Sequence, residues 1–135
     1  ASLAYIGHAA GLKDDLLAWE NLSLGATLSG NPVTRDQAIE ALEKTGLADE
    51  THLPVRVLSQ GQRKRVALAR LHLSSDRPLW ILDEPFTALD HAAVDALRAT
   101  LEQHLSTGGA VVYTTHQEIN LPGTLHLDMD SLPAC

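Results

Sequence analysis

The sequence predicts an α/β fold with parallel strands, and one stretch near the carboxyl end carries most of this prediction. Residues 79–82 form a continuous apolar run after a proline, as expected of a strand buried on both faces. Residues 90–105 have helical spacing, and residues 110–113 form a second apolar run. A strand, a helix and a strand at this spacing form a βαβ unit, whose two strands are parallel with a right-handed crossover. The helix is expected to turn inward the residues Ala93, Leu97, Leu101 and Leu105.

The preceding residues predict one more strand and three more helices. Residues 3–6 are a short apolar run typical of a strand, and residues 14–24 have helical spacing. A capping box over residues 34–37 begins a helix that ends at Gly46. A second capping box, over residues 59–62, begins a helix whose apolar face continues to residue 74.

The composition excludes several classes of protein. The 135 residues suit one small domain, and 44% hydrophobic with 20% charged residues argue against disorder. The net charge of −7 leaves no electrostatic footprint for a nucleic acid, and the basic run at 63–65 is expected to form a solvated helix face. A single cysteine, Cys135, provides no disulfide framework, and no apolar run reaches the length of a membrane span.

Polar residues follow both apolar runs of the βαβ unit. Asp83 and Glu84 come after the first run, and Thr114, Thr115 and His116 after the second. Ligands bind beyond the carboxyl ends of parallel strands, so two carboxylates and an imidazole are expected to converge there. The alternative is that Asp83 caps a turn and His116 is an ordinary loop histidine. For one residue alone the two interpretations are balanced, whereas the combination favours a functional site.

A second candidate lies in LSQGQRKRVALAR, over residues 58–70. It contains a helix amino terminus with the Ser59 hydroxyl, a glycine at Gly61 that allows close backbone approach, and unpaired amides. Such a terminus attracts anions. An ordinary capped helix is the alternative, and local geometry alone favours that alternative.

As a string, this segment resembles the signature motif of ABC-type ATPases, with Gln60 where a glycine is usual. Residues 79–85 resemble the Walker B strand of that family, residues 86–90 its D-loop, and His116 its switch histidine. The four motifs occur in the family's order and spacing. Since a chance coincidence of four motifs is very improbable, the sequence is identified as a member of that family.

Further similarity points to one branch of the family. Residues 5–13 (YIGHAAGLK), 19–22 (WENL) and 66–71 (VALARL) are similar to the ATP-binding subunit of the haem exporter used in cytochrome c maturation. His8 falls where most ABC-type ATPases carry the Q-loop glutamine. The likeness covers nearly all of the chain before about residue 121.

The resemblance implies a P-loop NTPase (ABC ATPase) fold that is incomplete. Residues 1–13 would supply a core strand and the Q-loop region. Residues 14–75 would form a mostly helical subdomain with the signature motif. Residues 76–135 would supply the Walker B, D-loop and switch-histidine part of the parallel-sheet core.

The resemblance also implies ATP and Mg²⁺ as the bound groups. Asp83 would act on the magnesium shell, Glu84 would polarise the attacking water, and His116 would contact the γ-phosphate. His8 would couple the nucleotide to a membrane partner, although an imidazole is a poorer ligand for Mg²⁺ than an amide oxygen. The remaining implied nucleotide-binding or dimer-seam residues are Ser59, Gln60, Gly61, Gln62 and Asp90.

The implied partners are a second ATPase subunit, with nucleotide at the interface, and transmembrane transporter subunits, but no nucleic acid. They place the protein in the cytoplasm, peripheral on the inner face of the cell membrane. In a chain with the phosphate loop restored, we expect Gly61→Asp to leave the melting temperature nearly unchanged and to abolish ATP-driven formation of this dimer.

The sequence lacks the phosphate loop G-x-x-x-x-G-K-[ST] that such an ATPase needs, because none of its three lysines follows a glycine. The segment from Gly25 to Gly30 has the glycine spacing but no lysine, and follows a predicted helix. The phosphate loop is then expected upstream of Ala1, and the 135 residues alone would be inactive. The alternative function is that of a catalytically inactive, truncated fragment that serves as a binding or regulatory module.

Overall fold

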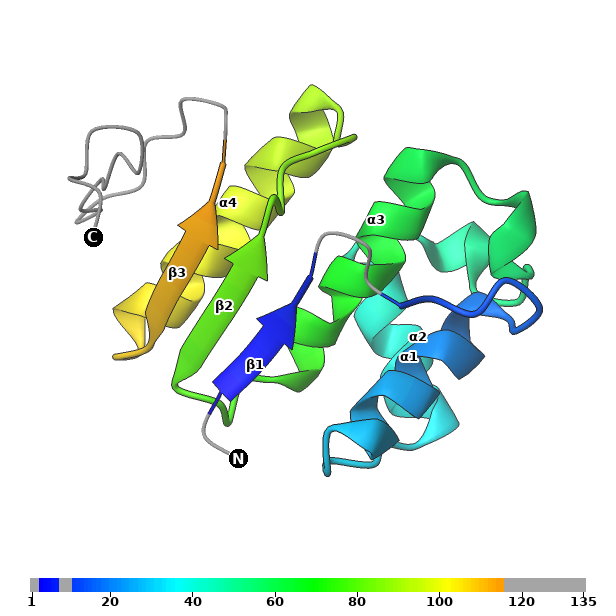
Figure 1. The fold of residues 1–135 in the computed structure, drawn as a ribbon, viewed down its shortest axis with the longest axis horizontal. Helices are drawn as coiled ribbons and strands as arrows, with labels where there is room; N and C mark the ends of the chain where they lie inside the picture. The colour runs from blue at the N-terminus through cyan, green and yellow to red at the C-terminus, as the bar shows by residue number, and fades with distance from the viewer. Residues whose placement is uncertain (1–2, 8–10, 116–135) are drawn as a thin grey trace, which may run out of the picture.

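A computed structural model describes residues 3–7 and 11–115 of the chain. Its sheet consists of three parallel strands in the order β1 (Leu3–Ile6), β2 (Leu79–Asp83) and β3 (Ala110–Thr114) (Figure 1). The register places Ile6 beside Leu82 and Asp83 beside Thr114. The predicted α/β class, the parallel strands and the strand over residues 3–6 are confirmed.

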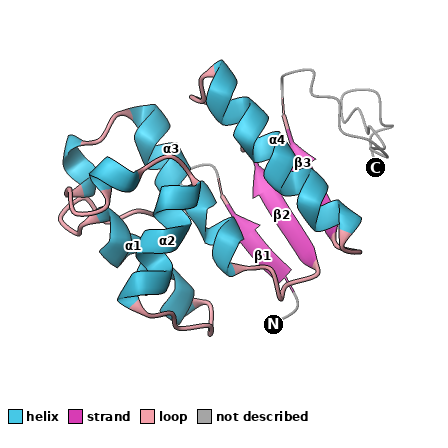
Figure 2. Cartoon of the chain, turned by 180° about the vertical axis from the view of Figure 1, so that it is seen from behind, coloured by secondary structure: helices cyan, strands magenta, loops and turns pink. Residues whose placement is uncertain are grey.

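Helices connect the strands. Four α-helices and three short 3-10 helices occur in the described residues: α1 (Ala18–Leu28), α2 (Arg35–Lys44), η1 (Ala48–Glu50), η2 (Val55–Val57), α3 (Gln60–Leu68), η3 (Ala69–Leu73) and α4 (His91–Ser106). The long α4 lies behind β2 and β3 in Figure 1 and in front of them in Figure 2. The helices α1 and α2 lie to one side of the sheet, beyond α3.

Two hydrophobic clusters hold these elements together, and α3 belongs to both. The sheet cluster contains Ala4, Ile6, Ala67, Leu68, Leu71, Trp80, Leu82, Phe86, Leu97 and Leu101. The helical cluster contains Ala18, Leu22, Ala38, Ala41, Leu42, Leu47, Val55, Leu58, Val66 and Ala69. Because α3 supplies residues to both clusters, it fixes the helical part of the chain against the sheet. The proposed division at residues 13 and 75 stays a prediction.

The first predicted helix begins later than expected. Residues 14–24 were predicted to be helical, whereas α1 begins at Ala18. The cause is tertiary: Leu17 forms an antiparallel bridge with Pro54, and the amide of Val55 donates to the Leu16 carbonyl at 3.0 Å. This pairing holds the backbone of Leu17 extended, which no helical pattern in the sequence reveals.

The prediction that β2 and β3 are buried on both faces is wrong for the described chain. Trp80 and Leu82 are buried, but Val112 on β3 is 56% exposed and Tyr5 on β1 is 53% exposed. Both α3 and α4 pack against the same face of the sheet, and no described helix or strand covers the other face.

The inward face of α4 also differs from the prediction. His104 is buried, while Leu105 is only partly buried. The His104 ring stacks on Trp80 with centroids 3.7 Å apart, and its Nε2–H donates to the Pro78 carbonyl at 3.0 Å. This ring leaves no room for a side chain at Gly109, which explains one of the two glycines after the helix.

Candidate functional site

The carboxyl ends of β2 and β3 are joined through the hydroxyl of Thr114. Its Oγ1 donates to Oδ1 of Asp83 at 2.7 Å and accepts the backbone N–H of Glu84 at 3.0 Å. Asp83 and Thr114 are register partners in adjacent parallel strands, which explains how residues 31 positions apart meet. Asp83 and Thr114 thus meet at this edge, whereas the predicted convergence of the two carboxylates with His116 stays a prediction.

Glu84 begins a turn in an unusual backbone conformation. Its φ of 51° lies in the left-handed region, as does the φ of 66° at Ala88. Non-glycine residues adopt this region rarely and at a cost, and they cluster at functional sites. Two contacts stabilise the turn: Thr87 Oγ1 donates to Glu84 Oε2 at 3.3 Å, and the buried Phe86 ring packs edge-on against Tyr113. The turn therefore holds the Glu84 carboxyl group just beyond the strand.

The predicted capping box at the start of α3 is confirmed. Oγ of Ser59 accepts the N–H of Gln62 at 3.1 Å, and the N–H of Ser59 donates to Oε1 of Gln62 at 2.9 Å. The Gln62 side-chain amide donates onward to Glu50 at 3.3 Å. Gln60 is exposed at the first position of the helix.

Gly61 has a contact that sequence reasoning missed. A Cβ atom there would lie 2.8 Å from the backbone carbonyl oxygen of Ala88, in the turn that follows Glu84. Real Cβ atoms do not approach backbone this closely, so the expectation that Gly61→Asp leaves the melting temperature nearly unchanged is wrong. The close approach brings the amino terminus of α3 against residues 84–90, although the two segments are far apart in sequence.

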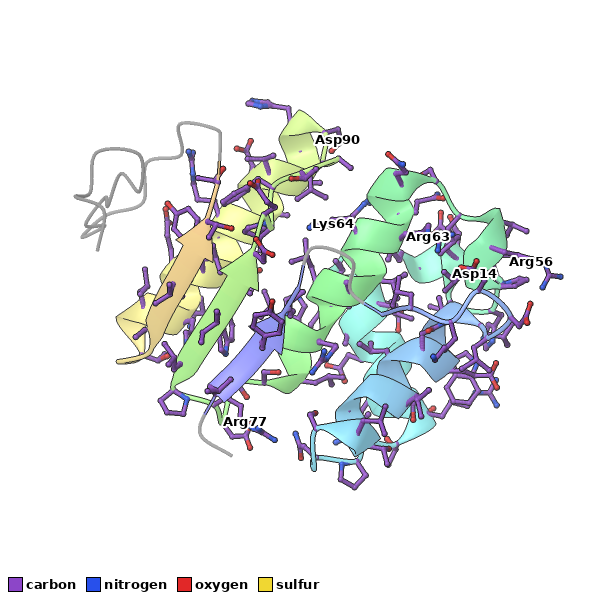
Figure 3. The ribbon with its side chains drawn as sticks, viewed as in Figure 1. Asp14, Arg56, Arg63, Lys64, Arg77 and Asp90 are labelled. Atoms are coloured by element: carbon purple, nitrogen blue, oxygen red, sulfur yellow. The ribbon has the colours of Figure 1, made fainter. Side chains whose placement is uncertain are left out.

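Asp90 is the N-cap of α4. Its Oδ1 accepts the N–H of Ala93 at 2.8 Å, which satisfies one amide of the first turn. Figure 3 shows Asp90 at the end of α4 that lies toward the carboxyl ends of the strands. This cap gives Asp90 a structural role, and its place in a dimer seam stays a prediction.

The two histidines of the predicted site, His8 and His116, lie outside the described residues. Gly7 and Thr115 are the nearest described residues on the amino-terminal side of each. The roles of both histidines therefore stay predictions.

An open cavity of about 530 Å³ lies between the helices and the ends of β1 and β2. Its lining includes Asp83, together with two basic side chains, Lys13 and Arg70. Burial lowers the pKa of Arg70, and the nearby Arg77 lowers it further. Ligands in parallel α/β folds bind at this edge of the sheet, so the cavity extends the candidate site toward β1.

The donor atoms at this edge fit Mg²⁺ in kind. Asp83, Glu84 and Thr114 supply carboxylate and hydroxyl oxygens, which hard cations prefer. Within residues 3–7 and 11–115 no group of three or more His, Cys, Asp or Glu side chains could hold a metal by itself. Mg²⁺ usually takes one or two carboxylates and completes its shell with water and phosphate oxygens.

The sequence pattern of the ABC transporter family matches residues 1–87, more than half of the chain. The chain belongs to the ABC transporter family. The assignment of the Walker B motif to residues 79–85, which contain β2, and of the signature motif to residues 58–70, which contain α3, stays a prediction.

Two relatives of this ABC transporter chain have the same name. It is 55% identical over 117 residues to the cytochrome c biogenesis ATP-binding export protein CcmA of Nitrosomonas europaea, covering 87% of this chain and 54% of the relative. It is 50% identical over 135 residues to the protein of that name from Aromatoleum aromaticum, covering 98% of this chain and 63% of the relative. The chain thus spans between half and two thirds of the length of these curated relatives.

A solved structure supports the fold assignment of this ABC transporter chain. The ATP-binding cassette MJ0796, in a dimeric post-hydrolysis state bound to ADP and Pi, superposes with a TM-score of 0.74 at 27% identity. The alignment covers 86% of this chain and 53% of that one. The α/β fold is therefore that of an ABC ATPase cassette, of which the chain represents a part.

Two residues of the site were not assigned a role by sequence reasoning. Thr114 was noted only as part of the second strand's end, although its register with Asp83 in a parallel pair was a usable signal. Lys64 was expected on a solvated face, whereas it is buried. No periodicity in the sequence separated Lys64 from its basic neighbours.

Proposed function

We propose that this chain is the signature and Walker B part of the ATP-binding subunit of an ABC exporter, similar to the haem-exporter type that serves cytochrome c biogenesis. The observation that carries the proposal is the hydrogen-bonded arrangement of Asp83, Thr114 and Glu84 at the carboxyl edge of a parallel sheet, in a chain of this family. Its CcmA relatives, which are named as ATP-binding export proteins, support the exporter assignment.

Hydrolysis of ATP needs positioning and charge stabilisation more than covalent chemistry. Bound Mg²⁺ would neutralise charge on the phosphate oxygens. Asp83 would bind the cation or a water molecule of its coordination shell. The hydrogen bond from Thr114 fixes the Asp83 carboxylate in one orientation. Glu84 would accept a proton from the attacking water, and His116 would contact the γ-phosphate.

The start of α3 would act on nucleotide held by a second copy of the subunit. Ser59 and Gly61 would donate to the γ-phosphate across the interface, flanked by Gln60 and Gln62. Asp90 would line the same seam. The dimeric state of the MJ0796 cassette supports this arrangement.

His8 would pass the state of the nucleotide to transmembrane subunits, which would hold the ATPase at the cytoplasmic face of the membrane. None of the helices in the described part of the chain has the length and apolar character to cross a membrane.

The test supplies the phosphate loop that the sequence lacks. The amino-terminal part of the Aromatoleum relative is fused before residue 1, and Mg²⁺-dependent phosphate release from ATP is measured. We expect turnover in this extended chain, and a decrease of roughly two to four orders of magnitude in Glu84→Gln. Glu102→Gln, which changes an exposed carboxyl on α4, is the matched control and should retain full activity. Undiminished phosphate release in Glu84→Gln would contradict the proposed role of Glu84.

The same experiment separates the second candidate function, an inactive binding or regulatory module. The absence of G-x-x-x-x-G-K-[ST] from the 135 residues favours that candidate. Failure of the extended chain to hydrolyse ATP, with nucleotide bound normally, would support it.

A further inference from the structure

Lys64 is a buried cation that the proposed mechanism does not use. The residue is 8% exposed, and its Nζ is buried without a hydrogen-bond partner among the described residues. Lysine is almost never fully buried unless it is paired, because removing an ammonium group from water costs much free energy. A position this unfavourable calls for a nearby charge that stabilises it.

The flanking basic residues have different surroundings. Arg63 is half-exposed and forms an ion pair with Asp14, with Nη2 and Oδ1 2.6 Å apart. Arg65 lies near Gly46, where a Cβ would be 3.2 Å from an Nη atom of the arginine. Lys64 thus lies on a different face of α3 from either neighbour, and Figure 3 shows it on the side that faces the carboxyl end of β2.

The charges that face Lys64 are the two carboxylates of the candidate site. Burial lowers the pKa of the Lys64 ammonium group, and the negative charges of Asp83 and then Glu84 oppose this shift. No direct ion pair joins these residues in the part of the chain that the structure describes, so the attraction acts through space. Where water is largely excluded, such an attraction is screened less than it would be between exposed charges.

We propose that Lys64 is a tethered counter-ion of the Asp83–Glu84 pair, which holds α3 against the carboxyl end of β2 and competes with a divalent cation at that edge. The competition with a divalent cation rests on the proposed function, in which Asp83 acts toward Mg²⁺. The counter-ion role follows from the charges and burial of this chain alone. Lys64 is a positioning residue, since it acts through the two carboxylates.

The geometry gives this competition a structural consequence. Gly61 and Lys64 are one turn apart on α3, so the helix that touches residue 88 at its amino terminus also carries the ammonium group. A divalent cation at Asp83 would repel that group and weaken the hold on α3. Cation binding at the Walker B edge would thereby be communicated to the signature helix of the same chain.

The counter-ion role is tested without metal or nucleotide, in EDTA, by a double-mutant cycle on the 135-residue chain. The equilibrium constants for urea unfolding are measured for the parent, Lys64→Met, Asp83→Asn and the double variant. We expect the equilibrium constant of the double variant to differ at least fivefold from the value obtained by multiplying the two single effects. Asp83→Asn should destabilise the Lys64→Met chain less than it destabilises the parent. Lys44→Met is the matched control: it removes an exposed lysine that is paired with Glu40, and should combine multiplicatively with Asp83→Asn. A cycle for Lys64 that is multiplicative within twofold would overturn the inference, whatever the ATPase assay shows.

The competition is tested on the extended chain with Mn²⁺ as the probe, in the presence of ADP to supply phosphate oxygens, and binding is followed by electron paramagnetic resonance. We expect Lys64→Met to bind Mn²⁺ at least fivefold more tightly than the parent, Lys44→Met to differ by less than twofold, and Lys64→Arg to restore the weak affinity. Equal affinity in Lys64→Met and the parent would overturn the competition. No Mn²⁺ binding in any variant would overturn both the competition and the proposed cation role of Asp83.

Discussion

Gly61 and Ala88 make the contact that joins the two halves of the candidate site. The helix start and the turn after β2 are 27 residues apart, yet a Cβ at Gly61 would lie 2.8 Å from the carbonyl oxygen of Ala88. Ala88 itself has a φ of 66°, so the turn has little freedom to move away. The glycine therefore has a packing role within its own chain, in addition to the proposed contact with nucleotide across a dimer.

We expect Gly61→Ala to lower the free energy of unfolding by about 1–3 kcal/mol, because the added methyl group meets backbone that no side-chain rotation can clear. Gly25→Ala in α1 is the control, since its Cβ would lie 3.5 Å from Cδ of Arg70, an ordinary contact. That control should raise the stability by roughly 0.4–1 kcal/mol. Urea unfolding measures the free energy of unfolding of both variants. A Gly61→Ala chain at least as stable as the parent would contradict the prediction and show that the turn at Ala88 moves to accommodate the methyl group.

At the level of elements, α2 and α3 begin in nearly the same way. Thr34 and Gln37 exchange hydrogen bonds of 3.1 and 2.8 Å, and Ser59 and Gln62 exchange bonds of 3.1 and 2.9 Å. The cap is therefore structural in both helices and does not by itself mark a nucleotide site. What distinguishes α3 is its place, with its first turn against the residues that follow the acidic edge.

This similarity provides a matched pair of variants. Ser59→Ala and Thr34→Ala should each cost about 1 kcal/mol of stability, because each leaves a first-turn amide without its cap. Only Ser59→Ala should reduce ATP-driven dimerisation of the extended chain, measured by light scattering with Glu84→Gln present to slow hydrolysis. Equal dimerisation in the two variants would return α3 to the role of an ordinary capped helix.

At the level of the whole molecule, the sheet is covered on one face by α3 and α4, and its other face carries exposed apolar residues. Leu3, Tyr5 and Val112 are 41%, 53% and 56% exposed. Parallel sheets in complete α/β domains are covered on both faces. The apolar composition of the strands therefore suits a sheet with more cover than the described residues provide, consistent with relatives of which the chain spans 54% and 63%.

The missing phosphate loop should lower the affinity of the 135-residue chain for nucleotide. We expect the 135-residue chain to bind Mg-ATP weakly or not at all, because backbone amides and a lysine of a phosphate loop supply most of the contacts to the phosphates. Isothermal titration at millimolar Mg-ATP measures this, with the extended chain as the positive control. Micromolar affinity in the 135-residue chain would contradict the expectation and indicate a phosphate site of another kind.

Local chemistry was predictable from the sequence by itself. Features that depend on residues close together in the chain could be predicted from sequence patterns. They are the strand over residues 3–6, both capping boxes, the glycine end of α2 and the parallel βαβ unit. The convergence of Asp83 with Thr114 was also predictable, because parallel strands of similar length end at the same edge.

Only the tertiary structure decided which faces those elements present. The late start of α1 depends on the pairing of residues 16–18 with residues 53–55, and the glycine at position 61 depends on a carbonyl 27 residues away. Lys64 stands between two other basic residues in the sequence, and its burial follows from the docking of α3 on the sheet. Such contacts join segments that are far apart in the chain, whereas a sequence pattern reports only on residues that are close together in it.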